Sequence, residues 1–257
     1  MFKFYFLGED ERIKFLKEMY KEEKKNIENM DFADVIVTPI PFSKDGEKIT
    51  GTEVSVDEFG KKCINKKIVS GSISKENRRK LEINNVEYVD LMDLDEMAIL
   101  NAIPTAEGTI LEVLKETNFT IFNSNVLVLG FGRVGKIMCN TFKGLGAKLY
   151  CEARKEKDLA LIYSMGYNDI NLNKLNNYLD KMDVIINTIP HMMLDEKRLK
   201  LLKKDCFVID VSSKPGGVDF EVAKTLGINA KLVLGIPGKV APKTAAEYMK
   251  KIIDRII

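Results

Sequence analysis

The chain is poor in the residues on which several kinds of site depend. It has one histidine, no tryptophan and four cysteines among 257 residues. The cysteines lie far apart and include no Cys-x-x-Cys pair: Cys63, Cys139, Cys151 and Cys206. Since zinc-ligand spacing is absent, we expect no metal, and reduced, mostly buried thiols. No Ser-His-Asp or Cys-His arrangement can be recognised either.

The chain also lacks an excess of charge and a long hydrophobic run. Lysine and arginine total 40 against 38 acidic residues, a net charge of +2, which offers no strong field for nucleic acid or membrane lipid. No apolar run approaches the roughly 20 residues that span a bilayer. The apolar start, residues 1–8, is too short for a signal peptide and precedes three acids, so we expect a strand there. Neither a nucleic-acid nor a membrane partner is predicted.

Short apolar runs alternate with amphipathic stretches along the whole chain. The predicted strands are Lys3–Leu7, Val35–Pro39, Lys67–Ser70, Glu87–Asp90, Asn125–Leu129, Lys148–Glu152, Asp183–Thr188, Phe207–Val211 and Leu232–Leu234. Helical patterns between them are Glu11–Lys25, Lys136–Leu145, Asp158–Met165 and Glu196–Leu202. This alternation predicts βαβ units and parallel sheets covered on both faces.

The pattern divides near residue 100. A helix predicted over Thr105–Lys115 opens the second half, with Pro104 just before or at its first turn. We therefore predict two doubly wound α/β domains: residues 1–100 on the substrate side, and residues 101–242 as a Rossmann dinucleotide-binding domain. By analogy with two-domain enzymes, a helix over residues 243–257 is expected to join the first domain.

The most informative segment, residues 125–136, reads NVLVLGFGRVGK. It places Gly-x-Gly-x-x-Gly directly after an apolar strand and directly before a helix. In this motif Gly130 makes the tight turn, Gly132 lets the backbone approach a pyrophosphate, and Gly135 allows close packing of helix on strand. The diphosphate would lie on the free N–H groups at the positive end of the helix. Because another strand follows at the right distance, a dinucleotide site is favoured over a plain strand–turn–helix.

The end of that next strand indicates which dinucleotide binds. An acid about 20 residues after the glycines would hold the ribose 2′-hydroxyl of NAD. Counting 18 residues on from Gly135 reaches Ala153, followed by Arg154 and Lys155, and an arginine can hold the 2′-phosphate of NADP. A shift of one residue would make Glu152 the ribose ligand, but strand alternation puts Glu152 and Ala153 on opposite faces. We predict NADP; the alternative is NAD, with the two cations as ordinary surface residues.

Two further strand ends are expected at the same edge, because open α/β sheets bind ligands outside the carboxyl ends of their strands. Asn187 and Thr188 follow one strand, and Ser212 and Ser213 follow another. Each is a candidate to line the ribose or nicotinamide, with turn capping as the alternative. The predicted cofactor contacts are Gly130, Phe131, Gly132, Arg133, Val134, Gly135, Ala153, Arg154, Lys155, Thr188, Ile189, Pro190, Val211 and Ser212.

Several blocks resemble, in order, the dipicolinate synthase A-subunit family. They are residues 98–110, 130–135, 153–154, 187–190, 210, 215–217 and 237–245. The first hundred residues match more weakly, with Glu9 in place of the second glycine of a Gly-Gly-Asp-x-Arg start. This half is also shorter than is usual in the family.

The resemblance implies an enzyme that forms dipicolinate during bacterial sporulation, in the mother-cell cytoplasm. A dihydropyridine dicarboxylate would give a hydride to NADP, and the flavoprotein-like B subunit of the synthase would assist. Aromatisation of the ring supplies driving force, so the protein has mainly to bind, orient and exclude water. The sequence does not determine the oligomeric state, so a homo-oligomer is one of the possible states.

The two carboxylates of such a substrate need partners. The catalytic candidates are Lys214 and Glu107, and the substrate candidates are Ser70, Asn101, Thr105, Ser213 and Lys239. Thr105 would contribute through unpaired N–H groups at the start of its helix. Glu107, one turn into that helix, is the candidate proton acceptor, with stabilisation of the helix start as the alternative.

The role of His191 and two alternative functions of the chain also have to be considered. His191 stands near the predicted nicotinamide, but the corresponding family position carries small residues, so we do not expect it to be catalytic. A dehydrogenase of another small carboxylate would need a lysine–aspartate or histidine–glutamate pair, which we do not find. A sensing module would bind NADP without turnover.

Overall fold

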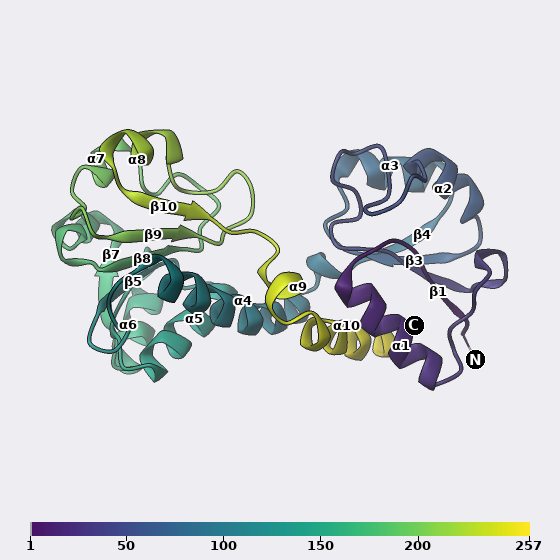
Figure 1. Cartoon of the computed structure of the whole chain (residues 1–257), viewed down its shortest axis with the longest axis horizontal. Coiled ribbons are helices and arrows are strands. Elements are labelled where there is room, and N and C mark those ends of the chain that lie inside the picture. The colour runs from purple at the N-terminus through teal and green to yellow at the C-terminus, as the bar shows by residue number, and fades with distance from the viewer. Residues whose placement is uncertain (1) are drawn as a thin grey trace. The chain divides into compact units, whose positions relative to one another are not determined.

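The computed structural model describes residues 2–257, and their contacts form two units (Figure 1). The first unit comprises the described residues up to Asn101 together with Pro237–Ile257, and the second comprises Ala102–Ile236. The sequence places these boundaries after residues 100 and 242. The segment that rejoins the first unit thus begins before helix α10 (Pro242–Ile256), within the short helix α9 (Ile236–Val240).

The second unit is built on six parallel strands. They are β5 (Asn125–Leu129), β6 (Lys148–Ala153), β7 (Asn168–Asn171), β8 (Val184–Asn187), β9 (Phe207–Asp210) and β10 (Asn229–Leu232). Their order is β10-β9-β8-β5-β6-β7, so the direction of winding reverses between β5 and β8. This is the doubly wound Rossmann arrangement, in which ligands bind outside the carboxyl ends of the strands at the reversal. The predicted fold class is confirmed.

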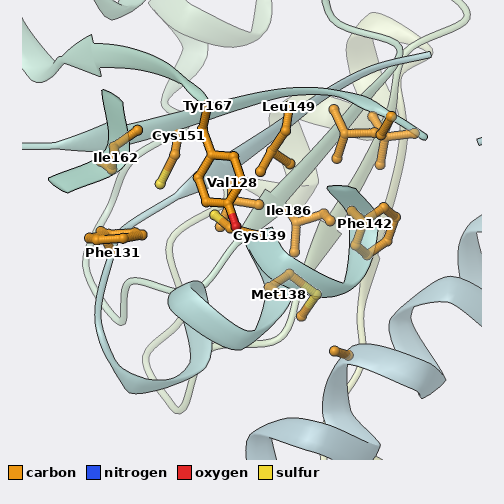
Figure 2. Close-up of a cluster of buried hydrophobic side chains, with 14 of the residues drawn as sticks. Val128, Phe131, Met138, Cys139, Phe142, Leu149, Cys151, Ile162, Tyr167 and Ile186 are labelled. Carbon is orange, nitrogen blue, oxygen red and sulfur yellow. The ribbon is translucent and has the colours of Figure 1, made fainter. Parts of the chain in front are cut away.

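Helices bury both faces of this sheet. On one face, α5 (Arg133–Gly144) and α6 (Glu156–Ser164) pack with β5 and β6 in the cluster shown in Figure 2, which includes Phe142 of α5 and Leu149 of β6. The other face is covered by η3 (Leu172–Asn177), η4 (Leu179–Lys181), α7 (Glu196–Leu199) and α8 (Phe220–Leu226). Successive β5 residues alternate between the two clusters, which explains the continuous apolar run of this strand.

The first unit has four parallel strands in chain order: β1 (Phe4–Phe6), β2 (Val35–Val37), β3 (Lys67–Ser70) and β4 (Glu87–Asp90). Helices α1 (Glu11–Glu22) and α10 bury one face. The other face is buried by α2 (Val56–Lys62) and α3 (Lys75–Ile83). Short 3₁₀ turns, η1 (Met30–Phe32) and η2 (Leu91–Asp93), lie before β2 and after β4.

A single residue explains why α1 covers one face of this sheet whereas α2 and α3 cover the other. Right-handed crossovers along the order β1-β2-β3-β4 would put all three helices on one face. At the outer edge of β1, however, Asn26 forms a parallel bridge with Phe4. The Phe4 amide donates to the Lys25 carbonyl (2.9 Å), and the Ile27 amide donates to the Phe4 carbonyl (3.0 Å). The sheet therefore has the flavodoxin-like order 2-1-3-4-5, with its second strand reduced to one bridge.

Helix α10 is held to α1 by a buried tyrosine. Tyr20 is fully buried and donates its hydroxyl to Asp254 (2.8 Å). The Lys250 ammonium lies 4.7 Å from the centre of the Tyr20 ring and also pairs with Asp254 and Glu23. Burial raises the pKa of Tyr20, so this hydroxyl remains a donor at physiological pH. Helix α10 thus belongs to the core of the first unit.

The predicted start of a helix at Thr105 is wrong. Helix α4 runs from Asp95 to Glu116 and contains Pro104 in its interior. A proline there removes one helical hydrogen bond, but Ala102 and Ala106 beside it are fully buried, and packing of this kind overrides local preference. Among the described residues α4 alone is long and apolar enough to cross a membrane, and 44% of its most apolar stretch is buried.

Two strands of the second unit depart from the prediction. β7 was not predicted, because its sequence, NDIN, is polar and only Ile170 is buried. The last strand lies at Asn229–Leu232 rather than at Leu232–Leu234, and it pairs with β9 through largely exposed residues. Both are edge strands, where the hydrophobic pattern on which the prediction rests is weakest.

We expect two glycine-to-alanine substitutions in α5 to have opposite effects. A Cβ on Gly135 would lie 2.0 Å from the Gly130 carbonyl oxygen, whereas a Cβ on Gly144 would have no heavy atom within 4 Å. Gly135→Ala should lower the unfolding free energy by about 2 kcal/mol or more, and Gly144→Ala should raise it by about 0.5–1 kcal/mol. Urea unfolding followed by circular dichroism measures both. Equal stabilities would contradict the close helix–strand contact.

Candidate functional site

The turn between β5 and α5 has no room for a side chain at Gly130. Gly130 has φ +94°, a left-handed conformation that favours glycine. A Cβ there would lie 2.8 Å from both Thr188 Oγ1 and Ile189 Cγ1. Together with the contact of Gly135 on the Gly130 carbonyl, this packs the start of α5 directly against the end of β5. By contrast, the space around the Cβ position of Gly132 is open, as approach of a phosphate there requires.

The first turn of α5 is suited to an anion. Gly132 is the N-cap residue, no side chain caps the helix, and no acid lies in the first turn. Its first N–H groups therefore have no capping side chain as acceptor, and they stand at the positive end of the helix dipole. A diphosphate fits this position by charge and by space. Phe131 is buried under the turn, with the Lys136 ammonium 5.3 Å from its ring centre.

The end of β6 carries the residues predicted to select the cofactor. Ala153 is buried with Cys151 in the cluster beneath α5 and α6, whereas Glu152 is level with Leu129 and Ile170, which belong to the cluster on the other face of the sheet. The predicted alternation is therefore confirmed. Arg154 and Lys155 are exposed beyond the strand end. Glu152 is only 1% exposed, and burial raises the pKa of its carboxyl group.

A buried network joins the ends of β8 and β9. The Asn187 amide donates to Asp210 Oδ1 (3.0 Å) and to the Ile189 carbonyl (2.9 Å). Asp210, fully buried, also accepts from the amides of Ser212 (2.9 Å) and Gly217 (2.7 Å). The loops after both strands are thus fixed to one carboxylate. Asp210 is not among the predicted site residues, although a carboxylate at a strand end before Pro-Gly-Gly was a usable signal.

The other predicted cofactor contacts gather around this network. The Thr188 hydroxyl donates to the Leu129 carbonyl (2.8 Å), which ties the β8 loop to the end of β5. Ser212 is buried, and its hydroxyl lies 3.4 Å from the Asn187 amide nitrogen. Exposed or half-buried positions are occupied by Arg133, Val134, Ile189, Pro190 and Val211. The structure thus brings the predicted cofactor residues to the carboxyl ends of four adjacent strands, β6, β5, β8 and β9.

The predicted substrate residues divide between the two units. In the second unit, Ser213 and Lys214 are exposed on the loop after β9, and the Ser213 carbonyl accepts from Gly216 (3.0 Å). In the first unit, Lys239 is exposed in α9, whereas Ser70 is fully buried and donates to the Pro39 carbonyl (2.9 Å). Asn101 is buried too, with its amide nitrogen 3.8 Å from the sulfur of Met92.

The extent of α4 corrects the roles assigned to two residues. Because the helix begins at Asp95, the amide of Thr105 lies in its interior and does not belong to a free helix start. Glu107 lies three turns from that start and is exposed. Stabilisation of a helix N-terminus, the alternative role for Glu107, is therefore wrong as well. What remains for Glu107 is an accessible carboxylate on the surface of the second unit.

The histidine and cysteine side chains do not gather at this site. Within residues 2–257, no group of three or more histidine, cysteine or acidic side chains could hold a metal ion. All four cysteines are free and buried, and burial raises the pKa of Cys63 and of Cys206 to about 12. His191 is exposed after β8. What the site offers a ligand is therefore backbone amides, hydroxyls, ammonium groups and carboxylates.

Comparisons with known proteins identify the second unit. Residues 105–217 match the family described as D-isomer specific 2-hydroxyacid dehydrogenase, NAD binding domain. D-lactate dehydrogenase from Escherichia coli, 12% identical with a TM-score of 0.62, shares the fold across 99% of this chain and 96% of its own. The second unit is a nicotinamide-cofactor domain of the dehydrogenase type, and the chain is an oxidoreductase.

Matches over the whole chain indicate a narrower family. The A subunit of dipicolinate synthase from Bacillus subtilis (strain 168) is 35% identical over 253 residues, covering 91% of this chain and 82% of the relative. The crystal structure of the A subunit from Bacillus halodurans has a TM-score of 0.91 at 32% identity, covering 99% of this chain and 97% of that one. The corresponding crystal structure from Bacillus subtilis has a TM-score of 0.90 at 28% identity, with coverage of 99% and 95%. The chain therefore belongs to the dipicolinate synthase A-subunit family.

Proposed function

We propose that the chain is the hydride-transferring subunit of a dipicolinate synthase. It would oxidise a dihydrodipicolinate to dipicolinate with NADP as acceptor, in the mother-cell cytoplasm of a sporulating bacterium. Its partner would be the flavoprotein-like B subunit of the synthase. The observation that carries the proposal is an uncapped dinucleotide-type helix start in a chain 35% identical to the A subunit of a dipicolinate synthase.

The reaction requires little covalent chemistry from the protein itself. A dihydropyridine ring becomes aromatic by losing one hydrogen as a hydride and one as a proton. Bound NADP would supply the hydride acceptor, at the nicotinamide ring. The chain has to orient the substrate, hold its two carboxylates and remove the proton. The network of Asn187 and Asp210 would fix the loops on which the substrate rests.

The candidate groups for these tasks are exposed and charged. Lys214 stands on the loop fixed by Asp210, where an ammonium group can pair with a substrate carboxylate. Ser213 beside it offers a hydroxyl. Lys239, exposed in α9, is a further proposed substrate residue. Glu107 is the proposed proton acceptor, an accessible carboxylate. Ser70, Asn101 and Thr105 are also proposed to contact the substrate; Ser70 and Asn101 are buried, and the amide of Thr105 lies inside α4.

NADP should bind more tightly than NAD, with Arg154 and Lys155 on the 2′-phosphate. Arg154→Ala should weaken NADP binding by about 1–3 kcal/mol, because a charge-assisted hydrogen bond is lost, and should leave NAD binding nearly unchanged. Fluorescence titration with the reduced cofactors measures both affinities. Lys157→Ala, an exposed lysine of α6, is the matched control. Equal losses for the two cofactors would remove Arg154 from the phosphate site.

His191 should prove dispensable for turnover. The side chain is exposed, and Asn187 and Asp210 organise the adjacent loops without it. His191→Ser should leave kcat within about tenfold of the original value, short of the 10²–10⁴ loss typical of a general acid or base. Turnover is to be compared at saturating cofactor. A larger loss with cofactor affinity intact would make His191 the proton-transfer residue.

The function itself is tested by mixing the protein with its flavoprotein-like partner and a dihydrodipicolinate. We expect the ultraviolet absorbance of dipicolinate to rise as NADP is reduced. Lys214→Met should lower kcat/KM more than about tenfold, because an unpaired substrate carboxylate is costly to bury, while NADP still binds. Lys197→Met, an exposed lysine of α7, is the control.

Two results would change this assignment. NADP binding without product, in the presence of both subunits, would favour a sensing module or a dehydrogenase of another small carboxylate. Product formation undiminished by Lys214→Met would keep the function and move the carboxylate site elsewhere.

A further inference from the structure

Arg12 is a buried cation in the first unit. It is only 8% exposed, and no other lysine or arginine within residues 2–257 is buried. It is the second residue of α1, shortly after the carboxyl end of β1. Burying a charge is costly unless the charge is paired and hydrogen-bonded, so the partners of this guanidinium group indicate what it does.

Three of the five N–H groups of this arginine are held within the first unit. Nε donates to Asp10 Oδ1 (2.8 Å), and Nη2 donates to Asp10 Oδ2 (2.5 Å) and to the Ile40 carbonyl (2.5 Å). Asp10 also caps α1 by accepting from the Arg12 amide (2.8 Å). Although burial opposes ionisation of Asp10, the hydrogen bonds and charge of Arg12 hold the pKa of Asp10 below its ordinary value, so the two side chains form an ion pair at physiological pH.

Helix α9 covers one face of the same guanidinium group. A Cβ on Gly238 would lie 2.9 Å from Nε, 3.0 Å from Cζ and 3.4 Å from Nη2 of Arg12, so the glycine stands over the flat face of the group. A side chain at this position would push the guanidinium away. Arg12 is therefore held in one orientation by Asp10, Ile40 and Gly238.

The third nitrogen of Arg12, Nη1, has no acceptor among the described residues. It is not one of their buried unpaired atoms either, so it is accessible from outside. Arg78 of the same unit differs: its Nε donates to the Ile73 carbonyl (2.9 Å), and its Nη1 and Nη2 donate to Asp93 (2.6 and 3.0 Å). An arginine that stabilises the fold can thus use all three nitrogens, whereas two N–H groups of Arg12 are left for a ligand.

These N–H groups lie where this kind of sheet binds ligands. With the bridge at Asn26, the winding of the first sheet reverses between β1 and β2. Open α/β sheets bind ligands outside the carboxyl ends of the strands at such a reversal. Arg12 follows β1, and its partner Ile40 follows β2. Arg12 therefore belongs to the ligand-binding edge of the first unit.

The charges around Arg12 suit a single carboxylate. Nη1 can donate to a carboxylate oxygen in a charge-assisted hydrogen bond, and the positive end of α1 and the exposed Lys239 favour an anion. Because Asp10 balances the charge of Arg12, the pair as a whole is neutral. The exposed carboxylates of Glu9 and Glu11 repel further negative charge. A singly charged group therefore fits better than a doubly charged phosphate.

We propose that Arg12 binds one of the two carboxylates of the substrate, and that Asp10 and Gly238 are positioning residues that fix its guanidinium group. The inference rests on the proposed function, from which the class of substrate comes. It assigns to the first unit a carboxylate contact made by a buried, pre-oriented arginine, which loses less conformational freedom on binding than an exposed lysine does.

The test uses the chain mixed with its flavoprotein-like partner and saturated with NADP. It measures KM and kcat for a dihydrodipicolinate, and the inhibition constants of dipicolinate, which has two carboxylates, and of picolinate, which has one. Arg12→Met removes the charge, and Arg12→Lys keeps the charge beside Asp10 without the planar fork. Arg78→Met is the control, because it removes an arginine of the same unit whose nitrogens are all engaged within the protein.

Arg12→Met should raise KM and the inhibition constant of dipicolinate about 10–100-fold, as for loss of a charge-assisted hydrogen bond, with a smaller change in kcat. The inhibition constant of picolinate should change little, because its one carboxylate can occupy the remaining subsite. Arg12→Lys should show the same pattern to a smaller extent, and it decides the question if Arg12→Met does not fold. Arg78→Met should leave the ratio of the two inhibition constants unchanged. Fluorescence titration should give the same NADPH affinity for every variant.

The outcomes separate this inference from the proposed function. Normal turnover with a KM that neither Arg12 variant changes would overturn the role of Arg12 and leave the function standing. Equal increases in the inhibition constants of dipicolinate and picolinate would make Arg12 a structural residue and would overturn its role as well. If the original chain and its partner form no dipicolinate, the proposed function fails, and the carboxylate contact fails with it.

Discussion

The second unit depends on one close contact, that of α5 on the end of β5. The contact is possible only because Gly135 has no side chain to strike the Gly130 carbonyl. The helix can therefore begin immediately above the sheet edge, with its first N–H groups directed to the space beside Gly132. A larger residue at position 135 would push the helix away, and the amides would no longer converge where a diphosphate needs them. The ends of β6 and β8 matter to the site because they flank this point.

Two buried carboxylates near this contact differ in their hydrogen bonding. Asp210 is satisfied by three donors and holds the loops after β8 and β9 in place. Glu152, on the other side of β5, is left without donors. A satisfied buried acid gives rigidity, whereas an unsatisfied one stores an unfavourable interaction that a ligand can relieve.

Much of this could be predicted from the sequence, because the pattern of a buried parallel strand followed by a glycine turn is physically specific. β3, β4 and β5 have the predicted bounds, and Ala153 faces the predicted side. Pro104 misled the prediction, because a local rule on proline could not weigh the burial of Ala102 and Ala106. The roles of Asp210 and Glu152 depend on which donors surround each carboxylate, and the sequence does not reveal that.

The division of the first unit between two separate stretches of chain affects how it is made. α1 presents Ile13, Leu16 and Tyr20 to a core that α10 completes, yet the 135 residues from 102 to 236 are synthesised between them. At about 5–20 residues per second, ribosomes need roughly 7–27 s for that interval. During this time α1 can pack on the strands of the first unit, but the part of that core which α10 buries, around Tyr20, is still incomplete. The second unit is a continuous stretch and can fold before α10 is made. The core of the first unit is therefore completed last, although its sequence is made first.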